Sequence, residues 1–325
     1  MKILISIYHI TDTEHPHFFK RAHLDAVRKT AGKKAKIVVT ADRKEAASHI
    51  ADADVLAGFP FTIPPLSGAK KLKWLHSFSA GVDRILTPET KRLPILISNS
   101  SGIHATPIAE HLIGFILIFT RRFHRILRNQ LRREWKRDET ITELRGKTVL
   151  VVGLGDIGME TARLARAFGA RVIAVSRTGK AKPPFVDELK TGRGLDALLP
   201  KADFVAICLP HTKETHHLFD RNKFKKMKRT AVVMNIGRGG IVDEKDLIRA
   251  LEQKIIGGAA LDVTEEEPLP KTSPLWNMEN VVITPHHSGL SEKYMDRAIE
   301  LFRRNLRAYL KGKRLLTLVN KELEY

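Results

Sequence analysis

A glycine-rich turn in the middle of the chain constrains the fold more than any other feature. It reads Gly153-Leu154-Gly155-Asp156-Ile157-Gly158, between the apolar run Thr148 to Val152 and a helical pattern, Asp156 to Phe168. In such a turn the first glycine permits the tight bend, the second lets the backbone approach a pyrophosphate, and the third lets the helix pack closely on the strand. The free N–H groups at the start of the helix stabilise phosphates. The motif therefore predicts a dinucleotide site formed by Gly153, Gly155, Asp156, Ile157 and Gly158.

Length and composition indicate a globular protein with two domains. The chain has 325 residues, more than one ordinary core needs, with 43% hydrophobic and 28% charged residues. Cys208 is the single cysteine, which excludes an internal disulfide framework and any multi-cysteine zinc site. The apolar start, Met1 to Ile7, is too short for a secretory signal, and no apolar run approaches membrane-spanning length. We therefore expect a cytoplasmic protein without a membrane partner.

Strand and helix patterns alternate through the first hundred residues, which is typical of a parallel sheet covered by helices. We expect a helix over His17 to Thr30 and strands over Lys2 to Ile7, Lys36 to Thr40, Ala53 to Ala57, Trp74 to Ser77 and Ile95 to Ser98.

A second α/β unit begins near Lys147, after a long apolar helix, Ile108 to Phe119, that runs into basic residues up to about Arg133. A last helix, about Ser291 to Tyr309, is expected to pack back on the first domain. The remaining strands are expected over Thr148 to Val152, Arg171 to Val175, Phe204 to Leu209, Ala231 to Ile236, Gly258 to Val263 and Val281 to Thr284, with Asp243 as N-cap of a helix over Glu244 to Leu251.

The predicted fold class is therefore α/β, with two Rossmann-like or flavodoxin-like domains whose sheets are parallel and an active site in the cleft between them. Residues 1–100 with 290–325 would form a discontinuous substrate (catalytic) domain. Residues 101–289 would form a dinucleotide-binding Rossmann domain, with a dimerisation helix and arm at about 105–140. The helix Ile108 to Phe119 is apolar around most of its surface, which predicts a homodimer, since two-fold dimers are the commonest assembly.

The residues after the second strand of this Rossmann unit indicate which dinucleotide binds. An NAD-preferring fold usually places Asp or Glu about 20 residues after the glycine turn, on the ribose 2′-hydroxyl. This chain has Ser176-Arg177-Thr178 there, and no acid appears until Asp187. A guanidinium pairs bidentately with phosphate oxygens, so Ser176, Arg177 and Thr178 favour NADP(H), with NAD(H) as the alternative.

Three later segments each carry one chemically useful side chain directly after a buried strand. They contain Arg238, Glu267 and His286. Because ligand sites in open α/β sheets form at the carboxyl ends of strands, we expect the three to meet. An imidazolium can protonate a carbonyl oxygen near neutral pH, a carboxylate beside it favours that charged form, and an arginine neutralises a carboxylate substrate. With a nicotinamide cofactor, this is the equipment for hydride transfer to a 2-oxo acid.

In these motifs the sequence resembles the D-2-hydroxyacid dehydrogenase family, which includes glyoxylate and hydroxypyruvate reductases. The resemblance covers nearly the whole chain. It rests on the glycine turn and on the segments 79–83, 102–104, 109–111, 235–239, 260–269 and 284–289.

The resemblance implies roles for single residues. Arg238 would bind the substrate, and Glu267 and His286 would form the proton-transfer pair. The backbone of Ala80 and Gly81 would hold the substrate carboxylate. Further cofactor contacts would come from Leu209, Pro210, Thr215, Ile236, Asp262 and Gly289. The partner is then a small 2-oxo or 2-hydroxy acid.

Other functions are less favoured by the sequence. With 56 Lys plus Arg against 36 Asp plus Glu the net charge is +20, but the basic run from Arg121 to Arg133 is typical of a solvated helix face and no nucleic-acid-binding signature accompanies it. His211, His216 and His217 lack carboxylate or cysteine partners at metal-ligand spacing, so no metal is expected. The alternative is a dinucleotide-sensing, corepressor-like binding protein on the same scaffold, which would not need Arg238, Glu267 and His286.

Overall fold

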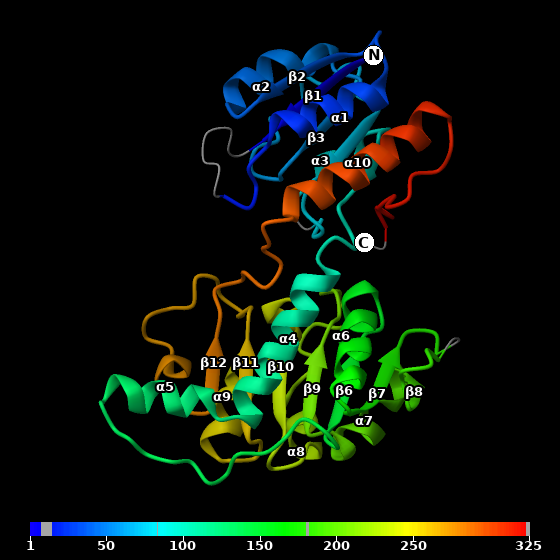
Figure 1. Cartoon of the computed structure of the whole chain (residues 1–325). Helices are drawn as coiled ribbons and strands as arrows, with labels where there is room; N and C mark the ends of the chain where they lie inside the picture. Colours follow the sequence, from blue (N-terminus) through cyan, green and yellow to red (C-terminus); the bar gives the residue numbers. More distant parts are fainter. Residues whose placement is uncertain (8–14, 83, 180–181, 323–325) are drawn as a thin grey trace. The chain divides into compact units, whose positions relative to one another are not determined.

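The computed structural model describes residues 1–7, 15–82, 84–179 and 182–322, and the chain separates into two compact units (Figure 1). Unit 1 comprises Met1–His104 and Leu290–Tyr325, and unit 2 comprises Ala105–Gly289. Asp83, which belongs to the 79–83 motif, lies outside the described residues.

Unit 1 is built on a parallel sheet whose strands follow the order β2-β1-β3-β4-β5. The chain turns to one side after β1 and then continues on the other, which is the flavodoxin-like order. The strands are β1 (Lys2–Ser6), β2 (Lys36–Thr40), β3 (Val55–Gly58), β4 (Trp74–Ser77) and β5 (Leu96–Ser98).

Helices cover both faces of this sheet because side chains of a strand alternate between its faces. Ile3 and Ile5 pack with α1 (Arg21–Ala31) and α10 (Tyr294–Leu310), whereas Leu4 lies in the opposite cluster with residues of α2 (Arg43–His49). The short helix α3 (Pro88–Arg92) precedes β5. The last helix thus belongs to the same compact unit as the N-terminal strands.

The first helix is shorter than the sequence pattern indicates. It begins at Arg21 rather than His17, because the backbone of residues 15–18 forms a turn in which Phe18 N donates to His15 O at 2.8 Å. The helix therefore begins only after this turn, with Lys20 as its N-cap.

Unit 2 contains a longer parallel sheet, in the order β12-β11-β10-β9-β6-β7-β8 among the described residues. The strand order reverses between β6 and β9, as in a Rossmann fold. Its strands are β6 (Thr148–Val152), β7 (Arg171–Ser176), β8 (Glu188–Thr191), β9 (Phe204–Ile207), β10 (Val232–Asn235), β11 (Gly258–Leu261) and β12 (Val281–Ile283).

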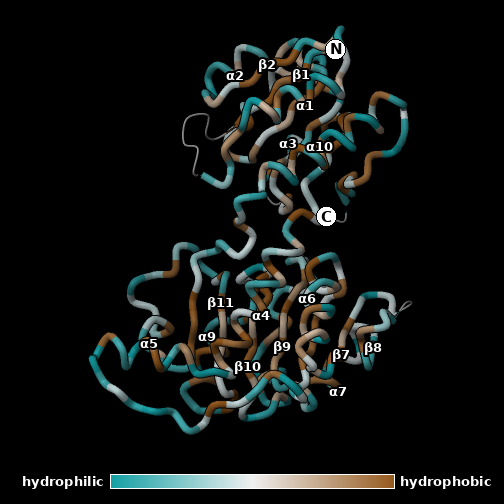
Figure 2. The backbone as a smooth tube through the Cα atoms, viewed as in Figure 1, coloured by the Kyte–Doolittle hydropathy of each residue, from teal (hydrophilic) through white to brown (hydrophobic). Residues whose placement is uncertain are grey.

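Alternating residues of this sheet also feed two separate cores. Val149 and Val151 pack with α4 (Ala105–Thr120) and α6 (Asp156–Ala167) on one face. Leu150 and Val152 pack on the other, where α7 (Leu195–Leu198), α8 (Arg221–Lys226) and α9 (Glu244–Glu252) contribute. In Figure 2 the strands of unit 2 carry mostly hydrophobic colour and the outer loops mostly hydrophilic colour. Asp243 caps α9 as expected, accepting from Asp246 N at 3.0 Å.

The apolar helix and the basic run that follows it form two helices, not one. Helix α4 ends at Thr120, Arg122 adopts a left-handed φ of 57°, and α5 runs from Phe123 to Leu131. The sequence pattern leads us to expect that apolar side chains of α4 pack against a second copy of the chain. In the structure most of them are instead buried in the core of unit 2 itself.

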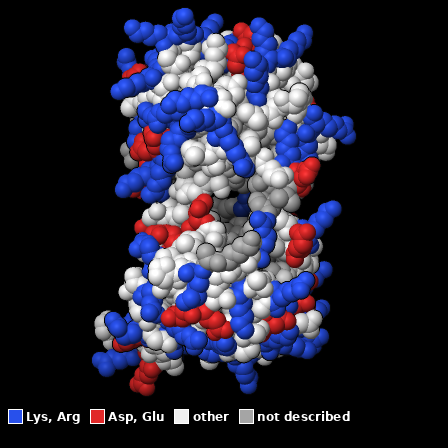
Figure 3. Space-filling view, turned by 90° about the vertical axis from the view of Figure 1, so that its right-hand side faces the viewer, with Lys and Arg blue, Asp and Glu red and all other residues white. Residues whose placement is uncertain are grey.

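The surface is basic, in keeping with the net charge of +20 (Figure 3). Lys and Arg side chains are scattered over the face shown, with Asp and Glu side chains among them. Within the ranges that the structure describes, none of the helices combines the length and apolarity that crossing a bilayer requires.

Candidate active site

The sequence motifs of unit 2 follow neighbouring strands of one parallel sheet, and therefore lie along one edge. The glycine turn follows β6, Ser176 ends β7, and Leu209 follows β9. Beyond them, Arg238 follows β10, Asp262 follows β11 and His286 follows β12. Segments scattered over more than half of unit 2 are thus brought to the carboxyl ends of its strands.

The three glycines of the turn are required for different reasons. Gly153 has a φ of +102°, and an added Cβ would lie 2.7 Å from the carbonyl oxygen of Cys208. A Cβ at Gly158 would overlap the carbonyl oxygen of Gly153, so helix and turn pack without space for a side chain. Gly155 is different, because a Cβ there would meet nothing within 4 Å. The fold explains the first and third glycines, and a bound ligand would explain the second.

The helix that follows the turn presents its N-terminus to this edge. Gly155 is the N-cap of α6, Asp156 is exposed in its first turn, and Ile157 is half-buried against the α4–α6 core. The amino end of α6 and its dipole therefore adjoin the open position at Gly155, as a pyrophosphate site requires.

At the end of β7 the hydroxyl of Ser176 accepts a hydrogen bond from Gly179 N at 2.9 Å, which shapes the turn carrying exposed Arg177 and Thr178. The next acid along the chain is held away from this end. Asp187 accepts from Val172 N at 2.8 Å, near the start of β7. The carboxyl end of β7 therefore offers a guanidinium and hydroxyls rather than a carboxylate.

The loop after β9 is ordered by its own polar groups. Thr215 Oγ1 donates to Pro210 O at 2.7 Å and accepts from Thr212 N at 2.7 Å. Leu209 packs against one core of unit 2, and Ile236 is buried in the other. These residues line the sheet edge, and the roles that the family resemblance gives them remain predictions.

The turn that carries Arg238 packs directly on the loop that carries Glu267. A Cβ at Gly239 would overlap the carbonyl oxygen of Thr264, so the two backbones touch. Arg238 Nη1 donates to Gly237 O at 2.8 Å, and Asn235 Nδ2 donates to Arg238 O at 2.9 Å. These contacts fix the conformation of the turn that carries the Arg238 guanidinium.

His286 and Glu267 form the hydrogen-bonded pair that the sequence suggests. His286 Nδ1 lies 2.7 Å from Glu267 Oε2, and both side chains are partly exposed. Glu267 Oε1 also accepts from Thr264 N at 3.3 Å, which orients the carboxylate. His286 has a left-handed φ of 50°, a conformation that costs a non-glycine residue on the order of 1 kcal/mol. The surrounding contacts must hold it there.

Asp262 supplies those contacts. It is 2% exposed, and its carboxylate accepts hydrogen bonds from Thr284 Oγ1, His287 N, Ser288 N and Ser288 Oγ. Burial raises the pKa of Asp262, but the hydrogen bonds from Ser288, Thr284 and His287 outweigh it and lower the pKa below its usual range. Asp262 is therefore an ionised, buried anchor for the segment on either side of His286.

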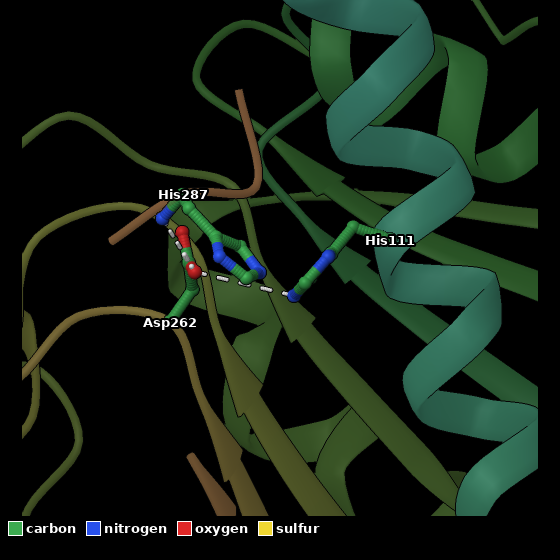
Figure 4. A group of neighbouring side chains, drawn as sticks. All are labelled: His111, Asp262 and His287. Carbon is green, nitrogen blue, oxygen red and sulfur yellow. Dashed lines mark hydrogen bonds and ion pairs between the residues drawn. The ribbon is translucent and has the colours of Figure 1, made fainter. Parts of the chain in front are cut away.

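Two further histidines lie beside this carboxylate (Figure 4). His111, from α4, has its Nε2 3.0 Å from Thr284 Oγ1 and 4.0 Å from Asp262 Oδ1. Its ring stands edge-on to that of His287, with centroids 5.5 Å apart. In the part of the chain that the structure describes, His111, Asp262 and His287 are the one group of three side chains with metal-ligand proximity.

The histidines that the sequence singles out for lack of metal partners make ordinary loop contacts. His211 Nε2 lies 3.1 Å from His216 Nδ1, and His217 Nε2 lies 2.7 Å from Glu265 Oε1. The first contact lies within the 211–217 loop, and the second connects this loop to the segment that leads to Glu267.

In unit 1, Ala80 and Gly81 follow β4. The carbonyl oxygens of this loop are engaged within the unit: Tyr294 Oη donates to Phe78 O at 3.0 Å, and Asn99 Nδ2 donates to Ala80 O at 2.6 Å. Hydrogen bonds to the carbonyl oxygens of Phe78 and Ala80 thus fix this loop at the carboxyl end of the unit 1 sheet.

Comparison with known proteins agrees with this arrangement. Residues 113–288 match the profile of the D-isomer specific 2-hydroxyacid dehydrogenase NAD-binding domain. The chain belongs to the D-isomer specific 2-hydroxyacid dehydrogenase family. A glyoxylate reductase of Thermofilum pendens is 38% identical over 263 residues, covering 79% of this chain and 78% of that protein.

Solved structures give the same result. A family member from Aeromonas salmonicida superposes with a TM-score of 0.86 at 31% identity, covering 98% of this chain and 99% of its own. An NADPH-dependent glyoxylate/hydroxypyruvate reductase from Sinorhizobium meliloti, in complex with NADP and sulfate, superposes with a TM-score of 0.82 at 27% identity, covering 100% and 99%. The protein is thus an oxidoreductase of the NAD(P)-dependent 2-hydroxyacid dehydrogenase type.

Sequence reasoning does not find the network around Asp262. The segments that contain His111, Thr284 and Ser288 carry the family resemblance, but nothing in their spacing indicates that these side chains meet. They come from α4 and from the segment after β12, and only the folded sheet brings them together.

The glycine turn generates the first prediction. Gly158→Ala should destabilise unit 2 by about 1–3 kcal/mol, the usual cost of overpacking, because its Cβ has no space. Gly155→Ala should leave the melting temperature nearly unchanged but raise the dissociation constant for NADPH roughly tenfold or more, equal to about 1.4 kcal/mol. Thermal denaturation and NADPH fluorescence titration measure the two effects. Tight NADPH binding by Gly155→Ala would rule out pyrophosphate at this turn.

Proposed function

We propose that the protein reduces small 2-oxo acids of the glyoxylate and hydroxypyruvate type to D-2-hydroxy acids, with NADP(H) as the favoured cofactor and His286 as general acid. The observation that carries the proposal is the 2.7 Å hydrogen bond between His286 Nδ1 and Glu267 Oε2 at the carboxyl edge of a dinucleotide-binding sheet. A protein that only senses a dinucleotide has no need of such a pair.

The pair suits proton transfer because it leaves one ring nitrogen free for the task. Glu267 accepts from Nδ1, so Nε2 is the atom that faces away from the carboxylate and can donate to a substrate oxygen. Glu267 stabilises the imidazolium by its charge and fixes the plane of the ring. His286 gives the Nε2 proton to the carbonyl oxygen in reduction and takes it back in oxidation.

Arg238 has the complementary task. Its guanidinium neutralises the substrate carboxylate and stabilises the negative charge that develops on the carbonyl oxygen. The close packing of Gly239 against Thr264 ties its turn to the loop of Glu267, so that the cation and the acid–base pair keep a common geometry. We further propose that the Ala80 and Gly81 backbone binds the substrate carboxylate.

The residues of the glycine turn fit a nicotinamide dinucleotide. The open position at Gly155 and the N-terminus of α6 suit a pyrophosphate, and Leu209, Pro210, Thr215, Ile236, Asp262 and Gly289 remain proposed as cofactor contacts. When bound, the reduced nicotinamide supplies the hydride that goes to the carbonyl carbon. The whole reaction converts one 2-oxo acid, one NADPH and one proton into one 2-hydroxy acid and one NADP⁺.

The preference for NADP(H) rests on the end of β7. Arg177, Ser176 and Thr178 offer a cation and hydroxyls to a 2′-phosphate, and the next acid along the chain, Asp187, is bonded at the opposite end of the strand. The Sinorhizobium meliloti structure, which contains NADP, supports this choice by similarity. We expect the protein to work in the cytoplasm.

The test is a panel of glyoxylate, hydroxypyruvate, pyruvate and phenylpyruvate, followed by loss of absorbance of NADPH or NADH. We expect turnover with glyoxylate and hydroxypyruvate and a lower KM for NADPH than for NADH. Arg177→Ala should raise the KM for NADPH about tenfold to a hundredfold and that for NADH little, because a charged hydrogen bond is worth about 1.5–3 kcal/mol.

Arg171→Ala is the matched control, since Arg171 lies exposed at the opposite end of β7 and should leave both values unchanged. A wild-type preference for NADH would contradict the cofactor assignment. Tight dinucleotide binding without turnover of any 2-oxo acid would favour the sensing function instead.

We also propose a homodimer, based on the segment after α4. Three apolar side chains at four-residue spacing are exposed on α5, Phe123 (47%), Leu127 (58%) and Leu131 (85%), and Trp135 (98%) is exposed just beyond the end of that helix. An exposed apolar stripe of this kind marks an interaction surface. A second copy of the chain is the simplest partner, because a two-fold interface pairs the same stripe with itself.

The dimer prediction is tested by sedimentation equilibrium at micromolar concentration. Wild type should sediment as a dimer, and the double variant Leu131→Asp/Trp135→Ser should sediment as a monomer with an unchanged melting temperature for its units. Leu316→Asp, at an exposed leucine of unit 1, should remain dimeric as the control. A monomeric wild type would end this proposal.

A further inference from the structure

A line of hydrogen bonds connects helix α4 to the segment that carries His286. It begins at His111 Nε2, which lies 3.0 Å from Thr284 Oγ1, and continues from Thr284 Oγ1 to Asp262 Oδ1 at 2.6 Å. Figure 4 shows the two end residues, His111 and Asp262. The three residues come from α4, from the segment after β12 and from the end of β11. The hydrogen bonds therefore lie at the carboxyl ends of β11 and β12, and the segment after β12 also contains His286.

The direction of the protons along this line follows from the hydroxyl. Thr284 has one hydroxyl proton, and the ionised carboxylate of Asp262 can only accept it. The hydroxyl oxygen is then the acceptor for His111, so His111 carries its proton on Nε2. Burial lowers the pKa of His111; the charge of Asp262 opposes this effect and His287 adds to it, and the net lowering favours the neutral ring. His111 thus donates to the Thr284 hydroxyl, and the Thr284 hydroxyl donates to the carboxylate of Asp262.

From Asp262 the line reaches the backbone around His286. The carbonyl oxygen of Asp262 accepts from His286 N at 2.8 Å, and Oδ1 accepts from His287 N at 3.1 Å. Ser288 adds its amide, at 3.1 Å from Oδ2, and its hydroxyl. These bonds hold both sides of a residue whose φ of 50° is unfavourable for a side chain of its type.

We propose that His111 is a positioning residue of the reaction: through Thr284 it fixes the carboxylate of Asp262, and Asp262 holds His286 in the turn that aims its ring at Glu267. The inference rests on the proposed function in one respect, because it takes His286 as the proton donor. It concerns the side chains of His111 and Thr284, which are not members of the acid–base pair.

The same side chains could instead be considered as a metal site, since ligand atoms of His111, Asp262 and His287 lie within 4.8 Å of one another in the described part of the chain. The hydrogen bonds argue against it. The carboxylate oxygens of Asp262 already accept two hydroxyls and two amides, and the proton on His111 Nε2 occupies the lone-pair position that a metal needs. An ion would have to displace Thr284.

Thr284→Val is the decisive variant, because valine matches threonine in shape and lacks the hydroxyl. It should lower kcat about ten- to a hundredfold, the effect of a small misplacement of a catalytic group, with the dissociation constant for NADPH nearly unchanged. Thr284→Ser should restore most of kcat. His111→Leu should lower kcat less than Thr284→Val does, and His111→Gln, which keeps a donor, should recover part of the loss.

A double-mutant cycle separates positioning of His286 from a direct effect on the cofactor. In a His286→Ala background, Thr284→Val should change the residual turnover little, because residues that act through one group are not additive. Amide hydrogen exchange of residues 286–288 supplies a readout without turnover. It should accelerate in Thr284→Val and His111→Leu, and stay at the wild-type rate in Thr284→Ser.

The outcomes distinguish the inference from the proposed function. Wild-type kcat and amide protection in Thr284→Val would overturn the inference and leave the reductase intact. Full activity of His286→Ala would overturn the proton donor itself, while the exchange data would still report whether the line holds the turn. Tight binding of Zn²⁺ by the wild type, lost in His111→Leu, would replace positioning with a metal site.

Discussion

The buried carboxylate of Asp262 is the interaction on which the geometry of this sheet edge depends. It is held ionised by hydroxyl and amide donors, and those donors belong to the segment that contains His286. A buried carboxylate that lost these donors would be strongly unfavourable, so the turn and the charge stabilise each other. The hydrogen bonds to Asp262 therefore hold His286 in its left-handed backbone conformation. Because this fixes the position of the His286 backbone, the imidazole lies within hydrogen-bond distance of Glu267.

The parallel sheets supply the second constraint. Strand order in unit 2 places six consecutive carboxyl ends side by side, and each carries one element of the site. Close backbone contacts then link neighbouring elements: Gly158 to Gly153 in the nucleotide turn, and Gly239 to the Thr264 loop. These contacts tolerate no side chain, which explains why glycines cluster where the chemistry is expected.

The sequence predicts much of this because the informative signals are local. The apolar, β-branched run at Thr148–Val152 gives a strand with the expected bounds, and so does the segment Trp74–Ser77, which begins with two large apolar residues. The polar edge strand β8, Glu-Leu-Lys-Thr, carries no alternation and is missed, as are the short charged helices α2 and α3. The break between α4 and α5 at Arg122 is not predicted, because no glycine or proline lies there to indicate it. The His111–Thr284–Asp262 line is missed for another reason, since tertiary packing alone creates it.

The central claim is that the hydrogen bond between Glu267 and His286 orients the imidazole so that it can donate a proton to the carbonyl oxygen of the substrate. The most direct measurement is kcat for glyoxylate reduction in wild type, Glu267→Gln and His286→Ala, under conditions where hydride transfer limits the rate, together with the dissociation constant for NADPH. Glu267→Gln should lower kcat because the amide no longer stabilises the charged ring. His286→Ala should lower kcat about 10²–10⁴-fold, the usual range for a positioned acid, and both variants should still bind NADPH. Wild-type kcat in either variant would contradict the account.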